Sequence, residues 1–413
     1  MKAISFLGTT DYKLTTYVYR DRCYKTEFFA ESLPHFFPDL ETILVFVTPT
    51  VQQHPNLAEL QKRLGERVQP VPIPEGHSEG DLWAIFDVLT SAVSDGDVVL
   101  FDITNSLRSL PFLVFLASAF LRTARQVQVT GVLYGAYEGD RSPVFDLSPF
   151  LTLLDWLTAT DQFIHTGDAR RLADLLKPAR GAGAAAAQTL SEVSLAAFLC
   201  QPFALMGRVG ELERNLQQAE GQLASSLRLQ ARPFGVLRGR IMDAFGAFAA
   251  DFDADPLAGL RAQWRLIEWY YANNQLIQAM TLAREWLISA VTYRLGQPID
   301  MALEARRVIE RALSGIARVG QMETAEVTGE KYEFSVSDLN EYGRRIWAEW
   351  PERDELKRLW NLLTAVRNAL DHAGHQKGPM ALKKIVKNAK TEVMPQLRAL
   401  AERWGMDGQE GNR

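Results

Sequence analysis

The sequence feature that most constrains the fold is a set of short apolar runs in the first 150 residues. Three of them are rich in β-branched and aromatic residues and show no in/out alternation, as expected of strands buried on both faces of a parallel sheet. The runs are Ala3–Gly8, Thr42–Thr48 and Asp97–Thr104, and Val127–Gly135 resembles a further strand. Apolar residues at helical spacing lie between them, in Asn56–Glu66, Gly80–Val93 and Ser109–Thr123. This order predicts a doubly wound, Rossmann-like α/β domain with a parallel sheet.

Beyond Pro149 the strand signal almost disappears and amphipathic helical patterns dominate. A chain of 413 residues is too long for one ordinary core. We therefore expect three parts: an α/β domain at 1–150, a helical connector at 151–250 and an all-α domain at 251–413. The Gly/Ala-rich stretch Pro178–Gln188 indicates a flexible joint within the connector, and Gly315–Asp338 indicates a polar loop or small insertion.

Composition and charge narrow the class of protein. The chain is 47% apolar with a formal net charge of -5, so any polyanion is expected to bind at local sites rather than along a basic surface. Cys23 and Cys200 fit no disulfide or metal framework, and no His-Glu-x-x-His motif is present, so we expect no metal cofactor. The longest apolar run, Leu110–Leu121, is too short to cross a bilayer. A cytoplasmic protein without a membrane segment is expected.

Polar residues follow two of the predicted strands. One strand runs into Gly8–Tyr12, which offers a glycine, two hydroxyls and an aromatic ring. Another runs into Thr104, Asn105 and Ser106, which are good helix N-caps, and Arg108 adds a cation. Each stretch alone is typical of a turn or a cap. Because the carboxyl ends of parallel strands meet at one edge, the two together predict an anion pocket. No Walker lysine motif is present, which argues against a nucleoside triphosphatase.

Near the C-terminus, the segment Arg367-Asn-Ala-Leu-Asp-His372 has two interpretations. Arg367 and Asp371 have the spacing of a helical ion pair, and His372 would then only lie near the helix end. In the other interpretation His372 transfers a proton, Arg367 stabilises charge on a phosphate and Asn368 orients either group. On one helix Arg367 and His372 are about 140° apart, so a shared site requires two copies of the helix. The apolar stripe of this helix is predicted to comprise Leu356, Leu359, Trp360, Leu363, Val366 and Leu370.

Two further groups have a structural and a functional interpretation. Lys383, Lys387 and Lys390 share one helical face, either as a solvated surface or as a path for RNA. Four aromatic residues have a spacing that favours core packing over base stacking, namely Trp264, Trp269, Tyr270 and Tyr271.

Several stretches resemble the CARF–HEPN ribonucleases of type III CRISPR systems, which cyclic oligoadenylate activates. They are FLGTTDY, DITNSLRSLPF and LYGAYE, with RNALDH matching the HEPN motif Arg-Asn-x-x-x-His. The family often has a Gly-containing turn where this chain has Asn105-Ser106. The resemblance implies a CARF-like N-terminal domain and a HEPN-like C-terminal domain. It implies ring binding by Gly8, Thr9, Thr10, Tyr12, Thr104, Asn105, Ser106 and Arg108, and catalysis by Arg367, Asn368 and His372.

The function expected from the residues and the resemblance is a metal-independent endoribonuclease that cleaves single-stranded RNA. Its partners would be RNA, a cyclic oligoadenylate and a second copy of the chain, with a higher oligomer of dimers left open. A four-membered ring is favoured over a six-membered one by the resemblance. The competing class is a non-enzymatic nucleotide sensor whose helical half binds a partner or nucleic acid. A metal-dependent DNA nuclease would need a carboxylate cluster that the sequence does not offer.

Overall fold

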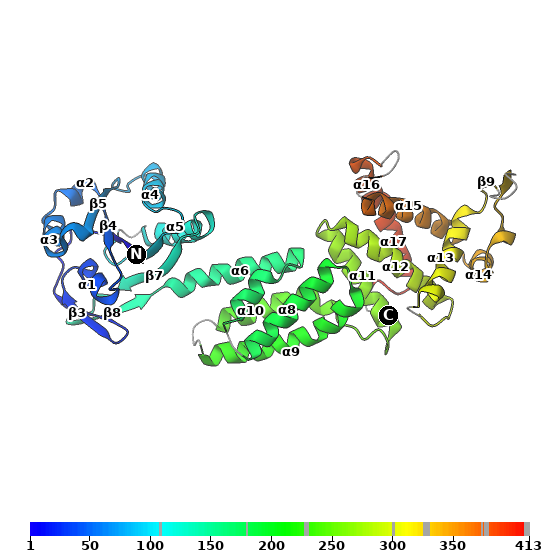
Figure 1. Cartoon of the computed structure of the whole chain (residues 1–413), viewed down its shortest axis with the longest axis horizontal. Coiled ribbons are helices and arrows are strands. Elements are labelled where there is room, and N and C mark those ends of the chain that lie inside the picture. Colours follow the sequence, from blue (N-terminus) through cyan, green and yellow to red (C-terminus); the bar gives the residue numbers. More distant parts are fainter. Residues whose placement is uncertain are drawn as a thin grey trace. The chain divides into compact units, whose positions relative to one another are not determined.

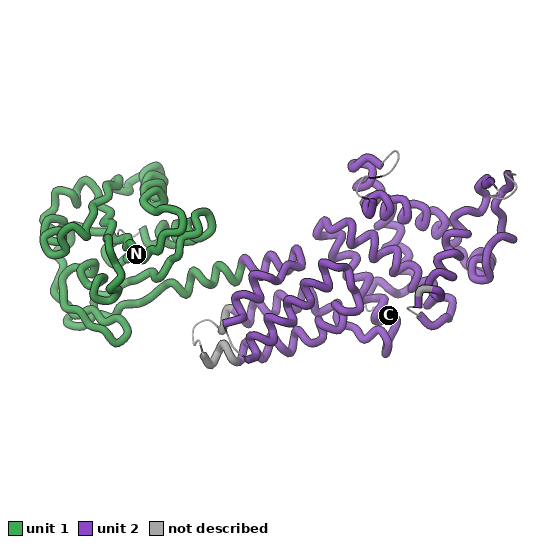
Figure 2. Tube along the Cα trace, in the orientation of Figure 1, with its two compact units in different colours: residues 1–157 green, residues 158–413 purple. Residues whose placement is uncertain are grey.

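The computed structural model describes residues 1–106, 110–178, 181–226, 231–299, 302–324, 331–372, 375 and 380–408. It divides into two compact units, Met1–Leu157 and Thr158–Arg413 (Figure 2). The first predicted domain, 1–150, falls within the first unit. The division of the remainder into a connector and a C-terminal domain at residue 250 stays a prediction.

The first unit contains an eight-stranded sheet with the strand order β3-β2-β8-β7-β6-β1-β4-β5. The five strands from β7 to β5 are parallel. The pairs β7–β8 and β2–β3 are antiparallel, whereas β2 and β8 are parallel. The strands are β1 (Lys2–Phe6), β2 (Thr15–Tyr19), β3 (Arg22–Thr26), β4 (Thr42–Val47), β5 (Val68–Pro72), β6 (Val98–Asp102), β7 (Gln128–Gly135) and β8 (Arg141–Asp146). The predicted α/β class is confirmed, with a largely parallel sheet.

Both faces of the sheet are covered, which explains the lack of alternation in the central strands. In β1, Ala3 and Ile4 point to opposite faces, and both are fully buried, in separate apolar clusters. Helices α1 (Phe29–Phe36) and α3 (Pro55–Leu64) contribute to one cluster. Helices α4 (Glu79–Ser91) and α5 (Leu110–Ala124) contribute to the other. The short α2 (Pro49–Gln52) precedes α3, and α6 (Ser148–Thr166) leads out of the sheet (Figure 1).

The second unit is mostly helical. Its helices are α7 (Arg170–Leu176), α8 (Ala182–Phe198), α9 (Pro202–Ser226), α10 (Ala231–Phe245), α11 (Pro256–Ala272), α12 (Leu276–Arg294), α13 (Leu303–Arg318), α14 (Glu341–Glu349), α15 (Arg353–Asp371), α16 (Leu382–Asn388) and α17 (Met394–Arg403). A π turn, η4 (Ala389–Val393), joins α16 to α17, and strands β9 (Met322–Thr324) and β10 (Lys331–Glu333) form a small hairpin. As expected, Trp264 and Tyr270 lie in the core, whereas Trp269 and Tyr271 are only partly buried.

Two local expectations were wrong. The predicted joint Pro178–Gln188 instead contains the start of α8, because alanine is the best helix former and Ala186 and Ala187 are buried there. The polar segment expected to begin at Gly315 starts later, since α13 continues to Arg318. A Cβ at Gly315 would lie 2.8 Å from Leu339 Cδ2, so the glycine permits close packing. In the described part of the chain, no helix is long and apolar enough to cross a membrane.

Candidate functional site

A pocket of about 510 Å³ lies at the carboxyl ends of β1, β6 and β7 in the first unit. The structure brings together seven of the residues predicted to bind a ligand. These are Gly8, Thr9, Thr10, Tyr12, Thr104, Asn105 and Ser106. Arg108, the remaining predicted contact, lies outside the described residues. The same pocket is lined by further residues that were not named as ligand contacts: Asp11 of the predicted loop, Tyr134, Gly135 and Tyr137 of the LYGAYE stretch, and Lys13, Tyr17 and Glu27.

The loop after β1 is held in place from two sides. The Gly8 N–H donates a hydrogen bond to the Tyr12 hydroxyl at 2.7 Å. The Asn56 side-chain amide, from α3, donates to the carbonyl oxygens of Gly8 and Thr10, both at 3.0 Å. A Cβ on Gly8 would lie 3.2 Å from the Tyr12 hydroxyl, so glycine allows this close approach. The loop is therefore built before any ligand arrives.

Beneath the pocket, a buried carboxylate ties the strand ends together. Asp102, at the end of β6, accepts hydrogen bonds from the Ser5 hydroxyl at 2.6 Å and the Thr104 N–H at 2.9 Å. The Thr104 hydroxyl in turn accepts from the Gly135 N–H at 2.9 Å. Complete burial raises the pKa of Asp102 to about 6. The Thr104 side chain thus bonds to β7, whereas a role in capping a helix had been predicted from the sequence.

The remaining polar groups of the pocket are hydroxyls and a few charges. Burial raises the pKa of both Tyr12 and Tyr17 to about 12, so their hydroxyls remain neutral hydrogen-bond donors at neutral pH. Tyr134 and Tyr137 are 41% and 53% exposed and offer aromatic faces to a ligand.

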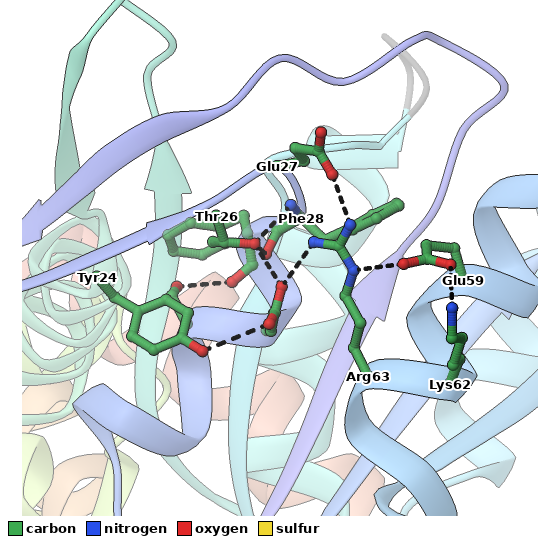
Figure 3. A network of polar contacts seen from close by, with 10 residues as sticks. Tyr24, Thr26, Glu27, Phe28, Glu59, Lys62 and Arg63 are labelled. Atoms are coloured by element: carbon green, nitrogen blue, oxygen red, sulfur yellow. Dashed lines mark hydrogen bonds and ion pairs between the residues drawn. The ribbon is translucent and has the colours of Figure 1, made fainter.

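The carboxylate of Glu27, which also lines the pocket, is paired with Arg63 at 2.6 Å. Figure 3 shows the Arg63 guanidinium between Glu27 and Glu59, and Arg63 also pairs with Glu31 at 3.2 Å. These ion pairs keep the pKa of Arg63 above its ordinary value. Neutralising Glu27 in this way lowers the electrostatic cost of an anion in the pocket.

In the second unit, α15 carries the predicted catalytic residues. Its apolar stripe is as expected: Leu356, Leu359, Trp360, Leu363 and Val366 are buried and Leu370 is partly buried. The Trp360 indole N–H donates to Ser314 Oγ of α13 at 3.1 Å, and the Arg284 guanidinium of α12 lies 5.2 Å from the centre of its ring. These contacts fix α15 against its neighbours, and Arg367, at the edge of the stripe, is partly buried.

The polar side of α15 contains the ion pair of the first interpretation. Arg367 Nε lies 2.7 Å from Asp371 Oδ2, but the Nε–H does not point at this oxygen, so the contact is an ion pair without a hydrogen bond. Arg367 Nη1 donates a hydrogen bond to Asn368 Oδ1 at 3.2 Å. His372 is exposed at the C-terminal end of the helix, where its backbone N–H donates a hydrogen bond to the Asn368 carbonyl oxygen at 3.1 Å. Among the described residues, no side-chain contact joins Arg367 to His372, in agreement with their angular separation.

The three lysines of the predicted RNA path are all exposed. Lys383 and Lys387 lie on α16 and Lys390 lies in η4, and within the described residues none of them pairs with a carboxylate. The described ranges also contain no group of three or more His, Cys, Asp or Glu side chains that could hold a metal ion. Both Cys23 and Cys200 are free.

Part of the chain is similar in sequence to known proteins. Residues 152–241 match the family described as CRISPR-associated protein MJ1674, second domain. The chain is 31% identical over 112 residues to CRISPR-associated protein MJ1674 of Methanocaldococcus jannaschii. These matches relate the chain to CRISPR-associated proteins. The aligned stretch spans 25% of this chain and 18% of that relative. The resemblance to CRISPR-associated proteins is thus confirmed.

Among solved structures, the chain is similar to Enterococcus italicus Csm6 bound to cyclic hexa-2'-fluoro-hexa-dAMP. The match covers 99% of this chain and 95% of that one, at 11% sequence identity and a TM-score of 0.40. A likeness at this level carries no weight for the ligand or the activity of this chain.

Proposed function

We propose that the chain is a cyclic-oligoadenylate-activated, metal-independent endoribonuclease that cleaves single-stranded RNA in type III CRISPR antiviral defence. The observation that carries this proposal is the pocket in the first unit, where the two separately predicted loops line one cavity. Hydroxyls, backbone N–H groups and exposed tyrosine rings suit phosphates, riboses and adenines. The CRISPR-associated match adds the biological setting.

The proposed active species is a homodimer. A pocket of about 510 Å³ suits one drug-sized ligand, and a ring of four nucleotides is larger than that. Two pockets facing each other would share such a ring. The exposed apolar side chains of α4 and α5 support this arrangement, because a clustered apolar surface typically marks an interface. They are Trp83, Phe112, Leu116 and Phe120, which are between 44% and 68% exposed.

The proposed chemistry needs two copies of α15. Five residues of helix separate Arg367 from His372 by about 7.5 Å along the axis and about 140° around it. Arg367 of one copy would stabilise charge on the phosphate, and His372 of the same or the other copy would move the proton. The RNA 2'-oxygen attacks its own phosphorus, the bond to the 5'-oxygen breaks, and that oxygen gains a proton. The products are a 2',3'-cyclic phosphate and a free 5'-hydroxyl, and DNA lacks the attacking group.

A non-enzymatic sensor is the alternative, and the Arg367–Asp371 ion pair is the observation that favours it. In that case α15 has a purely structural polar face. The first unit would still bind a nucleotide, and the second would bind a partner or nucleic acid.

Replacing His372 with alanine separates the two functions. Labelled single-stranded RNA is incubated in EDTA with the full chain and either cyclic tetra-adenylate or cyclic hexa-adenylate. We expect ligand-stimulated cleavage by the wild type and its loss in His372→Ala. His375→Ala is the matched control, because His375 is also exposed and lies three residues further on. Cleavage that survives His372→Ala refutes the catalytic role, and cleavage that EDTA abolishes refutes the metal-independent mechanism.

A further inference from the structure

The carboxylate of Asp102 joins the three strand ends that form the floor of the pocket. It is fully buried and bonds to Ser5 of β1 and to Thr104 of its own turn, and Thr104 is bonded to Gly135 of β7. Thr104 and Gly135 themselves line the pocket. A ligand that contacts the Thr104–Ser106 turn therefore lies directly above this carboxylate.

Among the described residues, little compensates the charge of Asp102. The described titratable groups that face it are the phenols of Tyr12 and Tyr17, which are neutral at ordinary pH. In the part of the chain that the structure describes, no Lys, Arg or His side chain pairs or hydrogen-bonds with Asp102. Of the described residues, the charged side chains that line the pocket are Asp11, Lys13 and Glu27. An anionic ligand would thus meet a like charge in a poorly screened site.

The Asp102 carboxylate can be protonated without losing its hydrogen bonds to Ser5 and Thr104. Asp102 Oδ1 accepts a hydrogen bond from the Thr104 N–H, and this bond stays the same when Oδ2 is protonated. Oδ2 faces the Ser5 hydroxyl, which can either donate or accept. If a proton from solvent binds Oδ2, that oxygen donates to Ser5 Oγ and the direction of this one bond reverses. The turn keeps its position in both protonation states.

We propose that the pocket takes up one proton when an anionic ligand binds, and that Asp102 is the residue that holds it. This inference rests on the proposed ligand site but not on RNA cleavage. Asp102 acts here as a positioning residue, because it holds the turn and does not itself touch the ligand.

The proposal fixes the sign of a pH effect. Free Asp102 titrates near pH 6, and a nearby anion raises its pKa further. Below pH 6 the proton is already present, so affinity should not depend on Asp102. Above pH 6 the dissociation constant should rise with pH, by up to about tenfold per unit, until the pKa of the complex is reached. Asp102→Asn resembles the protonated form and should remove this dependence.

Isothermal titration calorimetry of the full chain with cyclic tetra-adenylate and cyclic hexa-adenylate tests the proposal. Titrations at pH 7.5 in phosphate and in Tris, whose ionisation enthalpies differ, give the number of protons taken up. We expect net proton uptake for the wild type and none for Asp102→Asn. Ser5→Ala removes a hydrogen bond that lowers the pKa of Asp102, so it should move the pH range of proton uptake upward while leaving Asp102 in place, and it serves if Asp102→Asn does not fold.

A control variant separates Asp102 from its surroundings. His54→Gln removes a histidine that caps α3 beside Asn56. It should keep the wild-type uptake. Binding without proton uptake, or equal uptake in Asp102→Asn, overturns this inference and leaves the ligand site standing. An absence of binding for both rings overturns the ligand site and this inference together.

Discussion

The contribution of Arg367 can be separated from that of its ion pair by a matched pair of substitutions. Asp371→Asn and Arg367→Gln both remove the 2.7 Å pair. Only the second removes the guanidinium that we assign to the phosphate. If Arg367 has only a structural role, the two variants should behave alike.

The structure sets the size of the shared effect. The two side chains are 33% and 28% exposed, and a partly solvated i,i+4 pair is worth about 0.5 kcal/mol or less. In a unit of about 250 residues that loss lowers the melting temperature by about 1–2 °C. It also corresponds to about a twofold change if all of it appeared in a rate. Losing a group that stabilises transition-state charge typically costs about 100-fold or more.

The assay is single-turnover cleavage of labelled RNA at saturating cyclic oligoadenylate, with thermal unfolding of each variant measured alongside. We expect Asp371→Asn to cleave within about threefold of the wild type and Arg367→Gln to lose about 100-fold or more. Equal losses in both variants, or full activity in Arg367→Gln, would contradict the catalytic role of Arg367.

Three other predictions concern stability, assembly and RNA binding. In the folded protein the pKa of Asp102 is about 6, above its value of roughly 3.9 in an unfolded chain. The contribution of Asp102 to the free energy of unfolding is therefore most favourable below pH 4 and is lost as pH rises through 6. Hydrogen exchange of β1 and β6 should show opening free energies that fall by up to about 3 kcal/mol over this range, and a similar fall in Asp102→Asn would refute the assignment. Phe112→Glu on the exposed α4–α5 surface should shift sedimentation equilibrium from dimer to monomer, and an unchanged dimer would exclude this surface as the interface. Replacing all three lysines of the proposed RNA path, Lys383, Lys387 and Lys390, with glutamine should make the slope of log binding constant against log salt concentration shallower by about 2. An unaltered slope would indicate that these lysines form only a solvated face.

The central strands could be predicted because burial on both faces leaves a continuous apolar run, as Ala3 and Ile4 illustrate. The outer strands could not be predicted in this way. Strand β3 is mostly exposed, so its sequence Arg22-Cys-Tyr-Lys-Thr26 lacks an apolar pattern. Strand β5 contains Pro70 and Pro72, which argue against a strand unless it lies at an edge, and β5 is an edge strand.

The pocket was partly predictable for a related reason. Gly8 and Thr104 are the last residues of two predicted strands, so their place at one edge follows from the parallel sheet. Asn56 reaches the loop after β1, and Glu27 reaches the pocket, only through tertiary packing, for which the local sequence has no signal. In α15 the helical period predicted both the buried stripe and the separation of Arg367 from His372. In the proposed homodimer, the contacts of the polar side of α15 would depend on a second molecule, which no local pattern encodes.

The most direct test of the account is the rate of RNA cleavage as a function of cyclic oligoadenylate concentration, compared between the wild type and Gly8→Ala. A Cβ at position 8 would press on the Tyr12 hydroxyl and weaken the 2.7 Å bond that holds the loop. A loss of about 1–2 kcal/mol in ligand binding would move the activation midpoint by about 5–30-fold. Because α15 lies in the other unit, the maximal rate should stay the same. Superimposable curves for the two proteins, or a rate that does not depend on ligand, would contradict activation through this pocket.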